Sequence, residues 1–272
     1  MSCFIELEAA VETHTGKVRD LNEDNYYFDG KWRSANEASN TGFEASKKGE
    51  DFLFAVCDGM GGQNSGEKAS LEAVEYLESL HKIVDNNLSF NEKLHTLNKH
   101  ITLLNNRIYS KGFDKEDRGM GTTLAGIFIS SGKAYALHIG DSRVYMLRNG
   151  LLTQLTEDHT EAQRLVRMGV LEKSQARSHK SMYCLSRYLG MSPEDGEVEA
   201  TISQCIDLSE GDIFLITSDG LTDMVNEERI RSLISNSADT KDCVKSLVEE
   251  ALLEGGKDNI TVIVIKINGL CR

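Results

Sequence analysis

Short apolar runs that end at turns alternate along the chain with segments of helical periodicity. Four of these runs are rich in β-branched and aromatic residues, which predicts strands. They are DFLFAVCDG from residue 51, TTLAGIFISSGKAYALHIGDSRVYMLRNG from residue 122, GDIFLITSDG from residue 211 and NITVIVIKI from residue 259. The longest run contains two hairpin signals, SSGK at 130–133 and RNGL at 148–151, so we expect consecutive antiparallel strands in a meander there.

Four further segments place apolar residues three and four positions apart, which predicts amphipathic helices. They cover residues 65–84, 90–112, 160–170 and 239–256; the second carries Leu94, Leu97, Ile101, Leu104 and Ile108. Strands and helices come in blocks and do not alternate strictly, which favours an α+β fold of antiparallel sheets covered by helices. We expect no internal boundary, and therefore a single domain over residues 1–272.

Two polar segments interrupt this pattern. Residues 29–50 follow the strand-like NYYF at 25–28 and are rich in Ser, Asn, Gly and Lys, which predicts a long mobile loop or an elongated hairpin tip. Residues 173–190 form a second irregular region. Loops of this size often carry specificity, and for the first of them a plain surface excursion is an equal alternative.

Composition excludes several classes of protein. With 272 residues, 40% of them hydrophobic, the chain is long enough for a substantial core. Its formal charge of -13 and the absence of a dense Lys/Arg tract argue against a nucleic-acid partner. No apolar run approaches the roughly 20 residues that span a bilayer, so we expect no membrane association and a cytoplasmic protein. The six cysteines lack zinc-like spacing and are interpreted as free, mostly buried thiols; they are Cys3, Cys57, Cys184, Cys205, Cys243 and Cys271.

Three aspartates stand where an apolar run ends, each with a glycine beside it: Asp58, Asp141 and Asp219. A single Asp-Gly dipeptide is usually only a turn. Its repetition, together with NED at 22–24 and KDN at 257–259, predicts a gathering of carboxylates, which is costly unless cations neutralise it. Oxygen ligands without a His/Cys cluster suit Mg²⁺ or Mn²⁺ better than zinc or copper.

Seven ordered motifs make this pattern specific. They are GKVRDLNEDNYY, FAVCDGMGG, GTTLAGIF, LHIGDSRVYMLRNG, LTEDHT, LITSDGLTD and KDNITVIV, and they extend from about residue 10 to residue 267. The chain thereby resembles the metal-dependent Ser/Thr protein phosphatases of type 2C, especially their compact bacterial members. The resemblance implies a four-layer α-β-β-α fold with a central sandwich of two antiparallel sheets, and a dinuclear metal site at one end.

The resemblance also implies roles for individual residues. Asp58 corresponds to the carboxylate that bridges two metals, with the Gly59 carbonyl on one of them. Asp219 and Asp258 resemble ligands of the first metal. The acidic pair that serves the second metal, directly or through water, corresponds to Glu23 and Asp24. Arg19 resembles the arginine that holds the substrate phosphate, and a surface salt bridge is its plain alternative.

Other motif residues are interpreted as structural. Asp141 and Arg143 of GDSR are expected to form an ion pair at the end of a sheet, and GMGTT to pack a strand start tightly. A third metal, as in bacterial members, would need an acidic residue just ahead of GMGTT. Asp117 is the best candidate for it, with Asp158 as a second contact.

The implied reaction is hydrolysis of phosphoserine or phosphothreonine esters in a phosphorylated protein by a water that bridges two Mn²⁺ or Mg²⁺ ions. Met60 stands where many eukaryotic members carry a histidine proposed as general acid, so metal-bound water and His159 remain the candidate proton donors. Two alternatives stay open: a phosphatase-like binding regulator without turnover, and a hydrolase of small phosphoesters. We expect a monomer that opposes a Ser/Thr kinase.

Overall fold

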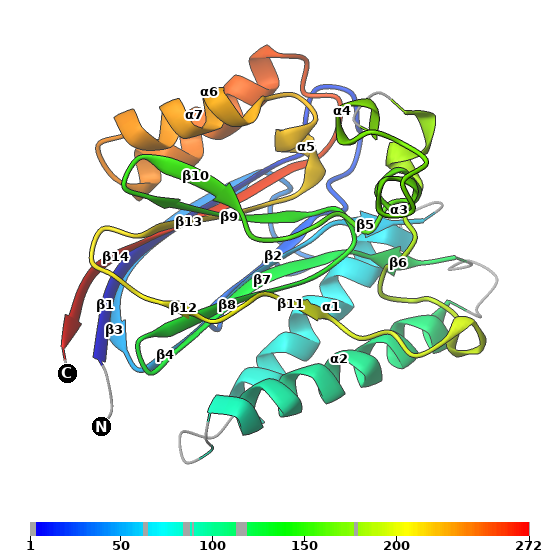
Figure 1. Ribbon diagram of the computed structural model, residues 1–272, viewed down its shortest axis with the longest axis horizontal. Coiled ribbons are helices and arrows are strands. Elements are labelled where there is room, and N and C mark those ends of the chain that lie inside the picture. Colours follow the sequence, from blue (N-terminus) through cyan, green and yellow to red (C-terminus); the bar gives the residue numbers. More distant parts are fainter. Residues whose placement is uncertain are drawn as a thin grey trace.

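The computed structural model describes residues 4–61, 65–83, 88, 90–112, 119–176 and 179–271. Two antiparallel sheets lie face to face, and helices cover the outer face of each (Figure 1). This four-layer α-β-β-α sandwich confirms the fold class expected from the sequence.

The first sheet has the strand order β10-β9-β13-β14-β1-β3. Its strands are β1 (Phe4–His14), β3 (Thr41–Gly49), β9 (Arg143–Arg148), β10 (Leu151–Gln154), β13 (Ile213–Thr217) and β14 (Ile260–Cys271). Its outer face carries α6 (Glu227–Asn236) and α7 (Thr240–Leu253), with the short α5 (Asp219–Thr222) directly after β13. In Figure 1 these helices form the upper layer.

The second sheet has the strand order β11-β8-β7-β4-β2, and β12 also pairs with β8. Its strands are β2 (Asn25–Phe28), β4 (Asp51–Cys57), β7 (Leu124–Ser130), β8 (Lys133–Ile139), β11 (Thr201–Ile202) and β12 (Ile206–Asp207). The helices α1 (Ser65–Ile83) and α2 (Phe90–Lys111) cover its outer face. A separate short ribbon pairs β5 (Gly59–Met60) with β6 (Gly121–Thr122).

Between β10 and β11 the chain runs along one end of the sandwich through short helical turns. These are α3 (Glu161–Arg167), α4 (Lys173–Ala176), η1 (Lys180–Tyr183) and η2 (Pro193–Asp195). The predicted irregular region 173–190 therefore contains α4 and η1, and Figure 1 places α3 and α4 at the same end of the molecule as β5 and β6.

The central strands are continuous apolar runs because both of their faces are buried. In β4, Phe52, Phe54 and Val56 face the core between the two sheets, and the alternate residues Leu53 and Ala55 face α1 and α2. The stripe predicted on α2 packs in that second core, with Leu97, Ile101, Leu104 and Ile108 buried and Leu94 partly buried.

Two predictions for the strands were wrong. Both hairpin turns form, with positive φ at Ser131, Gly132, Asn149 and Gly150, but the hairpins lie in different sheets. The chain crosses from one sheet to the other between β8 and β9, so residues 122–150 do not form the predicted meander. Within the predicted loop 29–50, β3 pairs along β1 as an edge strand. Its residues alternate between half-buried and exposed, a pattern that the many polar side chains concealed.

The cysteines were expected to be free and mostly buried, and the second part of this expectation was wrong. Cys57 and Cys243 are buried, whereas Cys184, Cys205 and Cys271 are exposed, and all five are free; Cys3 lies outside the described residues. Among the described residues, no helix combines the length and the apolar character needed to span a membrane.

Candidate active site

The registers of the two sheets bring the acidic motifs to one end of the sandwich. Cys57 at the end of β4 lies opposite Asn25 at the start of β2, so Asp58 emerges beside Asp24. In the other sheet, Thr217 at the end of β13 pairs with both Arg143 and Val262. Asp58, Asp141, Asp219 and Asp258 therefore leave or enter their strands at the same edge.

A cleft of about 580 Å³ opens at this edge. Its walls include six carboxylates and two cationic side chains. The carboxylates are Glu23, Asp58, Asp141, Asp219, Asp223 and Asp258, and the cations are Arg19 and Lys257. Gly59, Met60, Tyr183 and Asn259 also line it. Most of the residues predicted for the site are thus together, and Asp141 and Asp223, which the sequence analysis left out of the site, join them.

The backbone around Asp58 is held by the GMGTT segment. The Thr123 hydroxyl accepts from the Asp58 N–H at 3.0 Å, and the Thr123 N–H donates to the Asp58 carbonyl at 2.8 Å. Gly59 packs so tightly that a Cβ there would lie 2.1 Å from the Gly66 carbonyl oxygen and 2.5 Å from that of Glu23. The glycine next to Asp58 is thus required sterically, because backbone of two other segments occupies the space of a side chain.

Asp24 lies beneath the cleft and does not line it. It is 1% exposed and accepts from the Ser218 hydroxyl at 2.8 Å, while its other oxygen, Oδ1, is buried without a hydrogen bond among the described residues. Because Ser218 precedes Asp219, the buried carboxylate supports the end of β13.

Asn259 fixes the loop that carries Arg19 and Glu23. Its Nδ2 donates to the carbonyls of Thr15 and Leu21, each at 2.8 Å, and its Oδ1 accepts from the Glu23 N–H at 2.7 Å. Apart from the KDN motif, no pattern in the sequence indicates these three hydrogen bonds. Arg19 Nη2 in turn donates to Asp258 Oδ2 at 2.7 Å.

The carboxylates raise each other's pKa. Burial, then the charge of Asp24, raises the pKa of Asp58 well above its usual value, and burial with the charge of Asp141 does the same for Asp219. Burial also raises the pKa of Asp24 and of Asp141 to about 7. The site is therefore short of positive charge, although Arg19 and Lys257 lie in its wall.

This donor set fits divalent cations of the Mg²⁺ and Mn²⁺ type. Its ligands are carboxylate and carbonyl oxygens, and no His or Cys lines the cleft in the described part of the chain. Added positive charge would relieve the repulsion that raises these pKa values. As the side chains stand, no group of three or more acidic, His or Cys residues in the described ranges could hold a metal ion.

The prediction of an ion pair between Asp141 and Arg143 was wrong. Arg143 instead holds Asp158 with two bonds, from Nε at 2.8 Å and from Nη2 at 2.6 Å. The planar guanidinium fits both oxygens of that carboxylate, which Gln154 also contacts. Asp141 therefore faces the cleft. Both oxygens of Asp158 are bonded to Arg143.

Two further residues were candidates for the site: Asp117 as a ligand of a third metal and His159 as a proton donor. Asp117 lies outside the described residues. His159 is 5% exposed and is bound on both ring nitrogens, through Nδ1 to the Gly140 N–H and through Nε2 to Thr201 Oγ1. Burial lowers its pKa to about 3, and its ring stacks on His138 at 4.5 Å between centroids. It therefore packs behind the site and does not reach the cleft lining.

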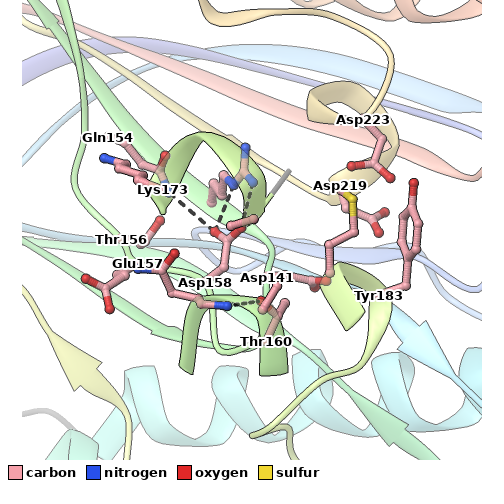
Figure 2. Close-up of a pocket in the computed structure, with 15 residues that line it drawn as sticks. Asp141, Gln154, Thr156, Glu157, Asp158, Thr160, Lys173, Tyr183, Asp219 and Asp223 are labelled. Atoms are coloured by element: carbon pink, nitrogen blue, oxygen red, sulfur yellow. Dashed lines mark hydrogen bonds and ion pairs between the residues drawn. The ribbon is translucent and has the colours of Figure 1, made fainter. Parts of the chain in front are cut away.

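A second hollow of about 300 Å³ adjoins the cleft under α3, α4 and η1. Figure 2 shows it with the Asp158 carboxylate at its centre and with Asp219, Asp223 and Tyr183 on one side. Asp141, Tyr183, Asp219 and Asp223 line both hollows, so a bound chain could pass from one to the other.

Known proteins resemble this chain in sequence and in structure. Residues 27–260 match the family "Protein phosphatase 2C". The chain is 32% identical to the serine/threonine phosphatase stp of Listeria welshimeri over 263 residues, 96% of each protein. The crystal structure of the Mycobacterium tuberculosis serine/threonine phosphatase PstP/Ppp has a TM-score of 0.79 at 32% identity and covers 97% of this chain and 100% of that one. A structure of the PstP catalytic domain in complex with two manganese ions has a TM-score of 0.76 at 31% identity, covering 98% and 100%.

Proposed function

The chain belongs to the protein phosphatase 2C family, and from this premise we propose how its own residues carry out the reaction. It is a metal-dependent serine/threonine phosphatase, and its substrates are phosphoproteins. The observation that carries the assignment is the cleft in which six carboxylates from distant parts of the sequence share one wall with Arg19.

The metal ligands are proposed from the lining of the cleft. Asp58 directly follows β4 in the wall of the cleft and would be the carboxylate shared by the two cations, with the Gly59 carbonyl beside it. Asp219 and Asp258 would hold one cation. Glu23 would hold the second, with Asp24 acting from below through its buried Oδ1, which has no hydrogen bond among the described residues. When bound, the two cations supply positive charge. This charge lowers the pKa of water and offsets the negative charge of the phosphate.

Arg19 is proposed to bind the phosphoryl oxygens. Its side chain is 53% exposed at the cleft, and its contact to Asp258 uses Nη2. The remaining donors of the guanidinium fork can face a phosphate while that contact persists. Asn259 fixes the loop from Thr15 to Glu23 and so sets the position from which Arg19 acts.

The setting of the enzyme is also part of the proposal. It acts as a monomer of one catalytic domain over residues 1–272 and opposes a Ser/Thr kinase. The core between the sheets, built from strands at both ends of the sequence, supports a single domain. The five free thiols among the described residues support a reducing compartment such as the cytoplasm.

Phosphate release from matched phosphothreonine and phosphotyrosine peptides tests the function. We expect turnover of the phosphothreonine peptide with Mn²⁺, none in EDTA, and little with phosphotyrosine. Asp58→Asn should lose both activity and Mn²⁺ binding, measured by isothermal titration. Binding of the phosphopeptide without turnover would instead indicate a binding regulator, and a preference for small phosphate esters over every phosphopeptide would indicate a hydrolase of small phosphoesters.

A further inference from the structure

A small groove of about 190 Å³ lies beside the catalytic cleft. Its walls come from β9, from η1 and from the segment that runs from the end of α5 to the start of α6. They are Arg143, Tyr145, Met182, Tyr183, Thr222, Asp223, Val225, Asn226 and Glu227. Tyr183 and Asp223 line both this groove and the cleft, so a peptide that leaves the cleft on this side passes the mouth of the groove.

The walls of the groove combine apolar surface with negative charge. Met182, Val225 and the ring of Tyr183 offer apolar and aromatic surface, and Asp223 and Glu227 supply carboxylates. Tyr183 is 67% exposed, an unusual position for a large aromatic side chain. The charge of Asp223 raises the pKa of the Tyr183 phenol, as expected from the closeness of the two groups in Figure 2.

The charge of the Asp223 carboxylate is not paired from within the groove. Arg143 is the cation in its wall, and both oxygens of Asp158 already hold that guanidinium. Asp223 is exposed, and its carboxylate makes no hydrogen bond or ion pair within the described residues. A ligand that brings a positive charge would therefore meet an available partner.

We propose that this groove receives a lysine or arginine side chain of the substrate, close in sequence to the phosphorylated residue. The inference rests on the proposed function and deepens it. The methylene stem lies along Met182, Val225 and the Tyr183 ring, and the cationic head meets Asp223 and Glu227. An acidic side chain would be repelled by the same two carboxylates, so the enzyme prefers phosphorylation sites flanked by basic residues.

The test is a set of phosphothreonine peptides in which lysine or its uncharged analogue norleucine occupies each position around the phosphorylated residue in turn. At one or more positions the lysine peptide should have about tenfold higher kcat/KM, from one cation–π contact and one exposed ion pair. The readout is the ratio of kcat/KM for the lysine peptide to kcat/KM for the norleucine peptide, taken within each variant. A general loss of activity lowers both values and cancels in this ratio.

Two pairs of variants complete the design. The double variant Asp223→Asn, Glu227→Gln should bring the ratio close to one. Glu228→Gln, which removes the neighbouring exposed charge in the same first turn of α6, should leave it unchanged. Tyr183→Leu should lower the ratio several-fold, and Tyr183→Phe should retain it because the ring remains.

Equal rates for lysine and norleucine at every position, or the same ratio in the double variant as in Glu228→Gln, would overturn the inference while leaving the phosphatase intact. The absence of turnover on every phosphopeptide would instead overturn the proposed function, and this inference with it.

Discussion

Arg19 Nη2 lies 2.7 Å from Asp258 Oδ2, although 239 positions separate the two residues in the sequence. The pair joins the side chain proposed to hold phosphate to one proposed to hold a metal. Both are partly exposed, at 53% and 39%, so the pair contributes little to stability. Its importance is geometric, because the metal and phosphate positions are then coupled through one contact.

Arg19→Ala removes a charge-assisted contact to phosphate and no metal ligand. We expect kcat/KM for a phosphothreonine peptide to fall about 10- to 100-fold, mostly through a higher KM, because a hydrogen bond from a charged group contributes about 1.5–3 kcal/mol. Steady-state kinetics measures this, with Mn²⁺ titration calorimetry as the control. The role would be assigned wrongly if Arg19→Ala lost Mn²⁺ binding while Asp58→Asn kept it.

Gly59→Ala tests the steric requirement beside Asp58. The new methyl group would meet the backbone of Gly66 and Glu23 at distances that no relaxed structure tolerates, so these segments must move. We expect a loss of about 1–3 kcal/mol in the free energy of unfolding, together with weaker Mn²⁺ binding. Urea denaturation in EDTA measures the change in the free energy of unfolding alone.

Gly150→Ala is a control for the loss of a glycine, because Gly150 ends a surface turn where no atom lies near the added group. The cost of this substitution should come from the positive φ of Gly150 and should leave Mn²⁺ binding unaffected.

The sequence predicted the layers and most of the carboxylate site, because apolar runs and ordered motifs are local signals. It did not predict β3 or the crossing between β8 and β9, since pairing along a polar edge and the choice of sheet depend on distant strands. The partner of Arg143 was missed for the same reason: Asp158 follows the β9–β10 hairpin, and the turn brings it back. Asp141 was consequently left outside the site that it lines.

His159→Asn tests whether the stacked histidines take part in proton transfer. Because its pKa is lowered to about 3, His159 stays neutral throughout the working range of pH and should not shape the rate profile. We expect the pH dependence of kcat to keep its shape in the variant. The midpoint of thermal unfolding should fall, since a buried ring that bonds Gly140 and Thr201 is replaced. Loss of one limb of the pH profile would make His159 a proton donor.

The carboxylate cluster predicts how the stability of the metal-free protein depends on pH. In the unfolded chain Asp24 and Asp141 lose their protons near 3.8, whereas in the folded protein they keep them up to about 7. The folded state therefore binds more protons between these values, and its free energy of unfolding falls as the pH rises through that window. Asp58 and Asp219 act in the same direction. Thermal unfolding in EDTA should have a midpoint several degrees lower at about pH 8 than at about pH 5.

Two controls separate this effect from other titrations. Asp141→Asn removes one of the repelling charges, so it should stabilise the metal-free protein near pH 8 and have little effect near pH 5. Mn²⁺ should raise the midpoint far more at pH 8, because the ionised carboxylates are the form that binds it. If the midpoint in EDTA rose steadily from pH 5 to pH 8, and Asp141→Asn lowered it at both, then these carboxylates would not repel one another in the folded protein, and the charge argument for the cation site would be wrong.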